Sequence, residues 1–178
     1  MTTRLQVSRD YPQGVAVFAA ALADPAFHRA RIAGGAGEVV SHDATADSVT
    51  VVLRQPVPAD AVPGPISRLL GASLVITRTE RWSLGTTRLS GTVDVVVPLA
   101  PVAADGSMTV TGVPPDGPAG PDGPDGGCRL AVDVGVRVTV PLAGALIEPS
   151  VVEGIRGLTT AEHDSISAYL RAAGRGGA

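Results

Sequence analysis

Arg78 and Glu80 are the residues whose types and spacing most suggest a polar site inside an apolar protein. They fall in a segment, residues 73–83, whose Thr, Val and Ile content predicts a strand. Side chains two residues apart on a strand point to the same face, and the apolar residues of that parity are Leu74, Ile76 and Trp82. If these face inward, both charges do too, which is costly unless they pair or meet a ligand.

Two interpretations of Arg78 and Glu80 follow. A solvated or structural ion pair is the more common arrangement, because such charges are rarely fully buried. The alternative is a polar feature of a ligand pocket. Asp94 on the next strand lies within cross-strand reach of Arg78 or Arg81, and we interpret it as part of a surface ladder of charges.

The other reactive residue types form no catalytic or metal-binding pattern. In the run His163-Asp164-Ser165, consecutive residues on a helix are about 100° apart, so they cannot converge on one proton-transfer path. His28, His42 and His163 lack the spacing of zinc ligands. Cys128 reads as a small hydrophobic residue at the start of a strand. We therefore expect no catalytic residues, metal or cofactor, and lean against an enzyme.

Composition limits the classes of partner. The chain has 178 residues with 44% apolar and 17% charged residues, as in a single globular domain, which we place at residues 1–174. A net charge of −3 with scattered arginines and no lysine disfavours nucleic-acid binding. No apolar run approaches the roughly 20 residues of a membrane span. Because one cysteine cannot form an internal disulfide, we expect a cytoplasmic protein.

The apolar periodicity predicts an α+β fold. A first strand covers residues 4–10 and is followed by two short helices, one over 13–23 and one that starts at Asp24-Pro25, with Phe27 and Ile32 as buried anchors. Further strands are expected at 38–43, 48–55, 73–83, 87–97, 107–111 and 128–140. The last strand alternates most cleanly, and its buried face is expected to hold Leu130, Val132, Val134, Val136, Val138 and Val140.

A long helix is expected between Pro141 and about Ala173, with Pro149 kinking or restarting it. Its apolar stripe comprises Val151, Ile155, Leu158, Ile166, Tyr169 and Leu170. Prolines from Pro56 to Pro65 end regular structure before Ile66, Leu69 and Leu70, which we interpret as a lid over a pocket. Residues 113–127 read as a flexible Gly/Pro-rich loop and 175–178 as a disordered tail.

Several strings resemble a known family. Tyr11-Pro12, Val15, Phe18 and Asp24-Pro25 resemble the opening of the START-like (SRPBCC, helix-grip) superfamily. The strings Arg54-Gln55-Pro56-Val57-Pro58-Ala59-Asp60, Leu74-Val75-Ile76-Thr77-Arg78-Thr79-Glu80-Arg81-Trp82 and Val138-Thr139-Val140-Pro141-Leu142 with Ile147-Glu148 resemble the actinobacterial family of unknown function DUF2505. The resemblance implies a curved antiparallel sheet of about seven strands wrapped around the C-terminal helix. It also implies a pocket, but no reaction.

The leading functional hypothesis is a binding or carrier module for a hydrophobic small molecule such as a lipid, polyketide or isoprenoid. The expected pocket residues are Leu74, Ile76, Arg78, Glu80, Trp82, Val134, Val136, Val151, Ile155 and Leu158. One alternative is a cyclase- or hydrolase-type enzyme that uses Glu80 and Arg78, with the pKa of Glu80 shifted by burial. Another is a protein-interaction domain with a filled core.

Overall fold

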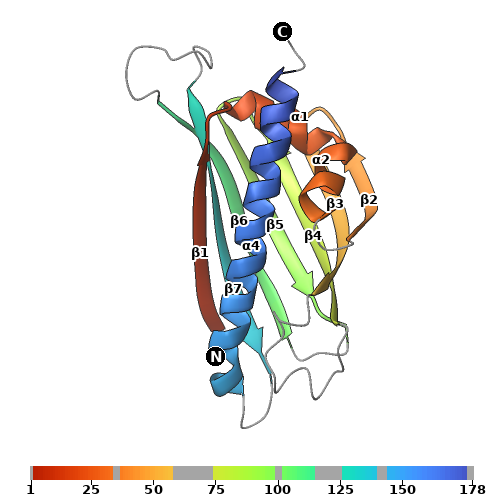
Figure 1. Ribbon diagram of the computed structural model, residues 1–178, viewed down its shortest axis with the longest axis vertical. Helices are drawn as coiled ribbons and strands as arrows, with labels where there is room; N and C mark the ends of the chain where they lie inside the picture. Colours follow the sequence, from red (N-terminus) through yellow and green to blue (C-terminus); the bar gives the residue numbers. More distant parts are fainter. Residues whose placement is uncertain are drawn as a thin grey trace.

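The computed structural model describes residues 2–33, 37–57, 74–98, 102–114, 126–139 and 144–175. Within these ranges seven strands form one antiparallel sheet that curves around a long C-terminal helix, as Figure 1 shows. The elements in chain order are β1 (Thr2–Tyr11), α1 (Val15–Ala23), α2 (Pro25–Ile32), β2 (Glu38–Ala44), β3 (Ser48–Val57), β4 (Leu74–Leu84), β5 (Arg88–Val96), β6 (Val102–Val113), β7 (Gly127–Val138) and α4 (Gly144–Arg175).

The strand order is β1-β7-β6-β5-β4-β3-β2, so sequential neighbours pair from β2 to β7 and β1 closes the far side against β7. Helix α4 runs along the concave face of the sheet, while α1 and α2 pack beside its C-terminal half (Figure 1). This arrangement confirms the predicted fold class. None of the helices within the described ranges is long and apolar enough to cross a membrane.

Strand β7 shows why one face of the sheet turns toward the helix. Leu130, Val134, Val136 and Val138 are buried and Val132 is half-buried, whereas Arg129 and Arg137 on the other face are exposed. The predicted alternation is therefore confirmed for the described residues of this strand, and Val140 lies outside them. Burial of one face with hydration of the other is what fixes the register of such a strand.

Helix α4 presents its apolar stripe to the sheet and to α2. Val151, Ile166 and Leu170 are buried, and Ile155, Leu158 and Tyr169 are half-buried. The start of α2 is tied to this stripe by Asp24. One oxygen of Asp24 accepts a hydrogen bond from the backbone N–H of Ala26 at 2.7 Å, as expected of a helix N-cap, and the other accepts from the Tyr169 hydroxyl at 2.6 Å.

Several element boundaries differ from the prediction by a few residues, and three of the differences have a clear physical reason. Strand β3 continues through Pro56, which lies opposite Val75 of β4. The last residue of β3 that pairs with the edge strand β2 is Arg54, so beyond it β3 has a neighbour on one side only. The missing N–H of a proline is tolerated there, because no residue of β2 needs it. Strand β6 begins at Val102 rather than Ser107 because β5 and β7 pair with it on both sides, which overrides the weak strand propensity of Asp105 and Gly106.

The third boundary is at α4, which starts at Gly144 and includes Pro149 instead of restarting at it. Pro149 is the sixth residue of α4, so its missing N–H removes one internal hydrogen bond close to the helix start, and the helix continues on both sides of it. The lid residues Ile66, Leu69 and Leu70 lie outside the described residues. So does most of the 113–127 loop, whose ends Val113 and Gly127 pair across the last rung of β6 and β7.

We predict that Val136 contributes to stability as a core residue. It is fully buried, so Val136→Ala should lower the free energy of unfolding by about 2–3 kcal/mol through lost burial and the cavity left behind. Val96→Ala is the matched control, because Val96 is 55% exposed and its loss should cost less than about 0.5 kcal/mol. Urea denaturation measures both, and equal effects would contradict the assignment of faces.

Candidate functional site

A cavity of about 290 Å³ lies between the concave face of the sheet and α4. Residues of α1, α2, α4 and all strands from β3 to β7 line it. Most of the wall is apolar and includes two aromatic rings from the short helices, Phe18 and Phe27, and Met108 from the centre of the sheet. A concave, mainly apolar space with a few polar groups is the usual form of a small-molecule site.

Seven of the ten residues predicted for the pocket line this cavity: Ile76, Arg78, Glu80, Trp82, Val134, Ile155 and Leu158. Val136 and Val151 are not among its lining residues and pack into the hydrophobic core instead. Leu74 begins β4 opposite Val57, and its side chain lies outside the described part of the chain. That these residues bind a ligand stays a prediction.

Four charged side chains form a closed ring in the cavity wall, which we call the charge ring: Arg31, Arg78, Glu80 and Glu162. Arg31 Nη2 donates to Glu80 Oε2 at 2.8 Å, and its Nη1 lies 3.1 Å from Glu162 Oε1. Arg78 donates twice to Glu162, from Nη1 at 2.6 Å and from Nη2 at 2.8 Å. Signs alternate around the ring, and its formal charge is zero.

The contact that closes the ring joins Arg78 to Glu80 on the same strand. Arg78 Nε lies 3.0 Å from Glu80 Oε1, without the geometry of a hydrogen bond, so this contact is an electrostatic one. The Trp82 indole N–H donates to Glu80 Oε2 at 3.1 Å, and the Arg31 guanidinium stands 5.6 Å from the centre of the Phe27 ring. The pair is therefore a buried ion pair that also lines the cavity, and its role in a ligand pocket stays a prediction.

Burial and pairing have opposite effects on the charges of the ring. Burial raises the pKa of Glu80, but Arg31 and Arg78 outweigh it and hold that pKa at about 2. Burial likewise raises the pKa of Glu162, and Arg78 and Arg31 bring it below its usual value. Burial by itself would lower the pKa of Arg78. The carboxylates of Glu162 and Glu80 raise it by more than that, so the pKa lies above its usual value. Glu80, Glu162 and Arg78 are thus all charged at neutral pH.

Sequence reasoning missed Arg31 and Glu162. A signal was present, because both occupy positions on apolar stripes. Arg31 lies four residues after Phe27 on α2, and Glu162 lies between Leu158 and Ile166 on α4, each four residues away. A charge at the centre of a helix's buried stripe indicates a buried partner, although the sequence alone does not say which.

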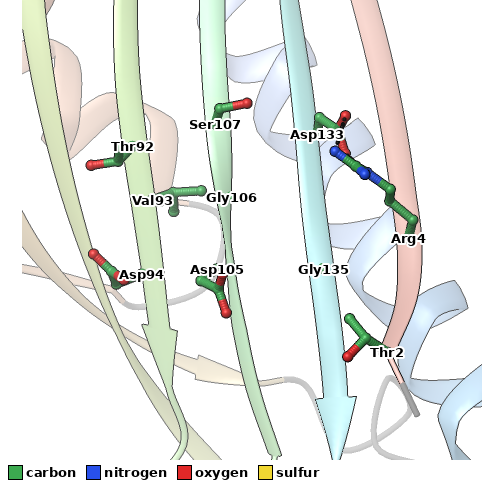
Figure 2. A pocket seen from close by; sticks show the side chains of 10 residues that line it. All are labelled: Thr2, Arg4, Thr92, Val93, Asp94, Asp105, Gly106, Ser107, Asp133 and Gly135. Carbon is green, nitrogen blue, oxygen red and sulfur yellow. Dashed lines mark hydrogen bonds and ion pairs between the residues drawn. The ribbon is translucent and has the colours of Figure 1, made fainter.

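A second hollow, of about 720 Å³, lies on the outer face of the sheet, away from α4 (Figure 2). Its carboxylates are already paired with arginines. Asp133 accepts from Arg4 at 2.7 and 3.0 Å, Asp105 pairs with Arg137, and the predicted surface contact of Asp94 with Arg81 is confirmed at 2.8 Å. We place the candidate site in the smaller inner cavity, because the outer hollow is open to water and most of its charged groups are exposed.

We predict that removing one charge from the ring is strongly destabilising. Glu162→Gln leaves two arginines facing one carboxylate, and an uncompensated buried charge costs about 3–5 kcal/mol. The matched control is Asp94→Asn, which removes a carboxylate from an exposed pair and should cost less than about 1 kcal/mol. Urea denaturation at neutral pH compares the two variants. Similar small losses for both would show that the ring is not a buried network.

Helix α2, which contributes Arg31 to the charge ring, also carries the buried titratable residue His28. This histidine predicts that the stability of the protein depends on pH. His28 is fully buried and donates from Nε2 to the Leu22 carbonyl at 2.8 Å. Burial lowers its pKa from 6.5 to about 4. Between these values the unfolded chain binds a proton that the folded protein does not, so the free energy of unfolding should fall as the pH drops from 6.5 to 4.

His28→Asn keeps a donor for the Leu22 carbonyl but removes the titration. Its unfolding free energy should therefore decline less than that of the wild type between pH 7 and pH 4, measured by denaturant titration at several pH values. An identical decline in both proteins would rule out His28 as a source of the pH dependence.

Solved structures with the same fold are distant in sequence. TTHA0849 from Thermus thermophilus has a TM-score of 0.60 at 15% identity, with 96% of this chain and 99% of that chain covered. The Zhui aromatase/cyclase from Streptomyces sp. R1128 has a TM-score of 0.60 at 9% identity, covering 96% and 94%. A conserved protein from Geobacillus kaustophilus has a TM-score of 0.60 at 12% identity, covering 95% of each chain.

These similarities establish the fold, which is the START-like, helix-grip fold expected from the resemblance. Among curated proteins, none has a sequence that matches this chain significantly. The family of proteins of unknown function DUF2505, however, matches residues 6–170 and so includes strands β2 to β7, most of β1, both short helices and most of α4. The protein therefore belongs to the DUF2505 family.

Proposed function

We propose that this protein binds a hydrophobic small molecule in the cavity between the sheet and α4, as a carrier or sensor and not as an enzyme. The observation that carries the proposal is the combination of an apolar cavity of about 290 Å³ with a wall whose charges neutralise one another. Such a space favours apolar surface, because any water inside has few free partners.

The cavity volume limits the size of the ligand. At roughly 30 Å³ for each water-sized group, about 290 Å³ holds on the order of ten non-hydrogen atoms. A short isoprenoid, a small polyketide or part of a lipid chain meets this limit. The structural similarity to an aromatase/cyclase supports small-molecule binding in the same fold, although it transfers no reaction.

The two alternatives fit less well. An acid–base enzyme built on Glu80 needs a carboxyl group whose pKa lies near neutral pH, whereas the two arginines hold the pKa of Glu80 at about 2. A protein-interaction domain with a filled core does not require an internal cavity. A cytoplasmic location is also part of the proposal, and it is supported by the single cysteine, Cys128, which is buried and unpaired.

Native mass spectrometry of freshly purified protein tests the proposal. We predict a co-purifying lipophile whose mass disappears after extraction with organic solvent. Ala104→Leu should reduce the bound fraction about tenfold or more, because Ala104 is buried in the cavity wall and overpacking costs about 1–3 kcal/mol.

Ala103→Leu is the matched control. Ala103 is the neighbouring residue on β6, and it points to the opposite face of the sheet, where it lies across from the exposed Val96. Its variant should retain the ligand. Equal retention by both variants, or protein that carries no lipophile and binds none when it is added, would overturn the proposal.

A further inference from the structure

His163 is a polar group in the cavity wall whose imidazole has hydrogen-bonding capacity to spare. Its side chain belongs to α4 and lines the cavity, and the residue is only 4% exposed. Among the described residues, none forms a hydrogen bond with its ring nitrogens. Its ring contact is edge-to-face with Tyr11, at 6.3 Å between ring centres. Its ring nitrogens are not among the fully enclosed polar atoms that lack a partner, so they remain accessible from the cavity to water or to a ligand.

Most other polar groups in the wall are already engaged. The charge ring is paired internally, as described above, although the Nε–H groups of Arg31 and Arg78 have no hydrogen-bond acceptor among the described residues. The hydroxyl of Thr159 donates to the Ile155 carbonyl at 2.8 Å, and that of Ser165 donates to the Ala161 carbonyl at 3.2 Å. Gln55 also lines the cavity but is half-buried, so water satisfies its amide at less cost. Spare capacity therefore remains at His163 and at the Nε–H groups of Arg31 and Arg78, and of these only the imidazole can accept a hydrogen bond as well as donate one.

The charge balance of the cavity limits what His163 can bind. Burial lowers the pKa of His163, so its imidazole is neutral at pH 7, and the charge ring sums to zero. A ligand carboxylate or ammonium group would bring an uncompensated charge into this space or break a buried ion pair, and both are costly. A neutral imidazole, by contrast, can donate to a carbonyl oxygen and accept from a hydroxyl group.

We propose that His163 is the residue that recognises the ligand, and that the ligand is an uncharged lipophile with a hydroxyl or carbonyl oxygen rather than a fatty acid or an amine. This inference rests on the proposed function and narrows its ligand class. In this arrangement His163 fixes the orientation of the ligand. The apolar wall supplies most of the affinity, and the charge ring excludes charged head groups.

Three probes of one ring system separate these contributions: naphthalene, 2-naphthol and 2-naphthoate. Calorimetric titration of the full-length protein at pH 7 should show 2-naphthol binding about tenfold more tightly than naphthalene, as expected for one net hydrogen bond. It should show 2-naphthoate binding at least about tenfold more weakly than 2-naphthol, because its charge is not compensated.

His163→Leu should bind naphthalene as well as the wild type does and lose the preference for 2-naphthol. His163→Gln keeps a neutral donor and acceptor and should retain part of that preference, which separates recognition from a purely structural role. His42→Gln is the control, because His42 does not line the cavity. Circular dichroism and thermal unfolding of each variant show that it is folded before it is titrated.

The possible results distinguish a failure of this inference from a failure of the proposed function on which it rests. Binding of naphthalene and 2-naphthol, with the preference lost in His163→Leu alone, supports both. Equal affinity of the wild type for 2-naphthol and 2-naphthoate, or an unchanged preference in folded His163→Leu, overturns the inference and leaves the proposed function standing. Failure of all three probes to bind the wild type overturns the proposed function and the inference with it.

Discussion

Four buried charges have to be paired with one another, and this requirement fixes how helix α4 lies against the sheet at the cavity. Arg31 comes from α2, Arg78 and Glu80 from β4, and Glu162 from α4, so the charge ring links three elements that are distant in the sequence. Each charge has a neighbour of opposite sign within about 3 Å. Since separating them would leave charges unpaired in an apolar wall, α4 has one favourable position over this part of the sheet.

Much of the fold could be predicted, because a helix or strand with one buried face has apolar residues at regular spacing in the sequence. The alternation of β7 and the stripe of α4 predicted a strand and a helix with one buried face each, and Asp24-Pro25 predicted the start of α2. Their arrangement as a curved sheet around the helix was implied by the family resemblance. Prediction failed where pairing partners override local propensity. Asp105 and Gly106 look like loop residues, yet strands on both sides hold them in β6. Pro56 looks like a strand end, yet no β2 residue needs its N–H.

Only two of the four residues of the charge ring could be predicted from the sequence, for a related reason. The parity of Arg78 and Glu80 with Trp82 placed the two charges on one face of β4, because that relation is local. Their partners are not local, since Arg31 is 49 residues from Glu80 and Glu162 is 84 residues from Arg78. Periodicity marks Arg31 and Glu162 as buried but does not say that they meet. The unpaired state of His163 likewise emerges only when all of its neighbours are known.

The position of Trp82 gives the protein a built-in optical reporter. It is the single tryptophan of the chain, its ring lines the cavity, and its N–H is held by Glu80. The emission of the native protein therefore comes from the wall of the cavity, next to a fixed carboxylate. An apolar occupant that displaces water from that wall would shift the emission toward the blue, so occupancy can be followed without a label.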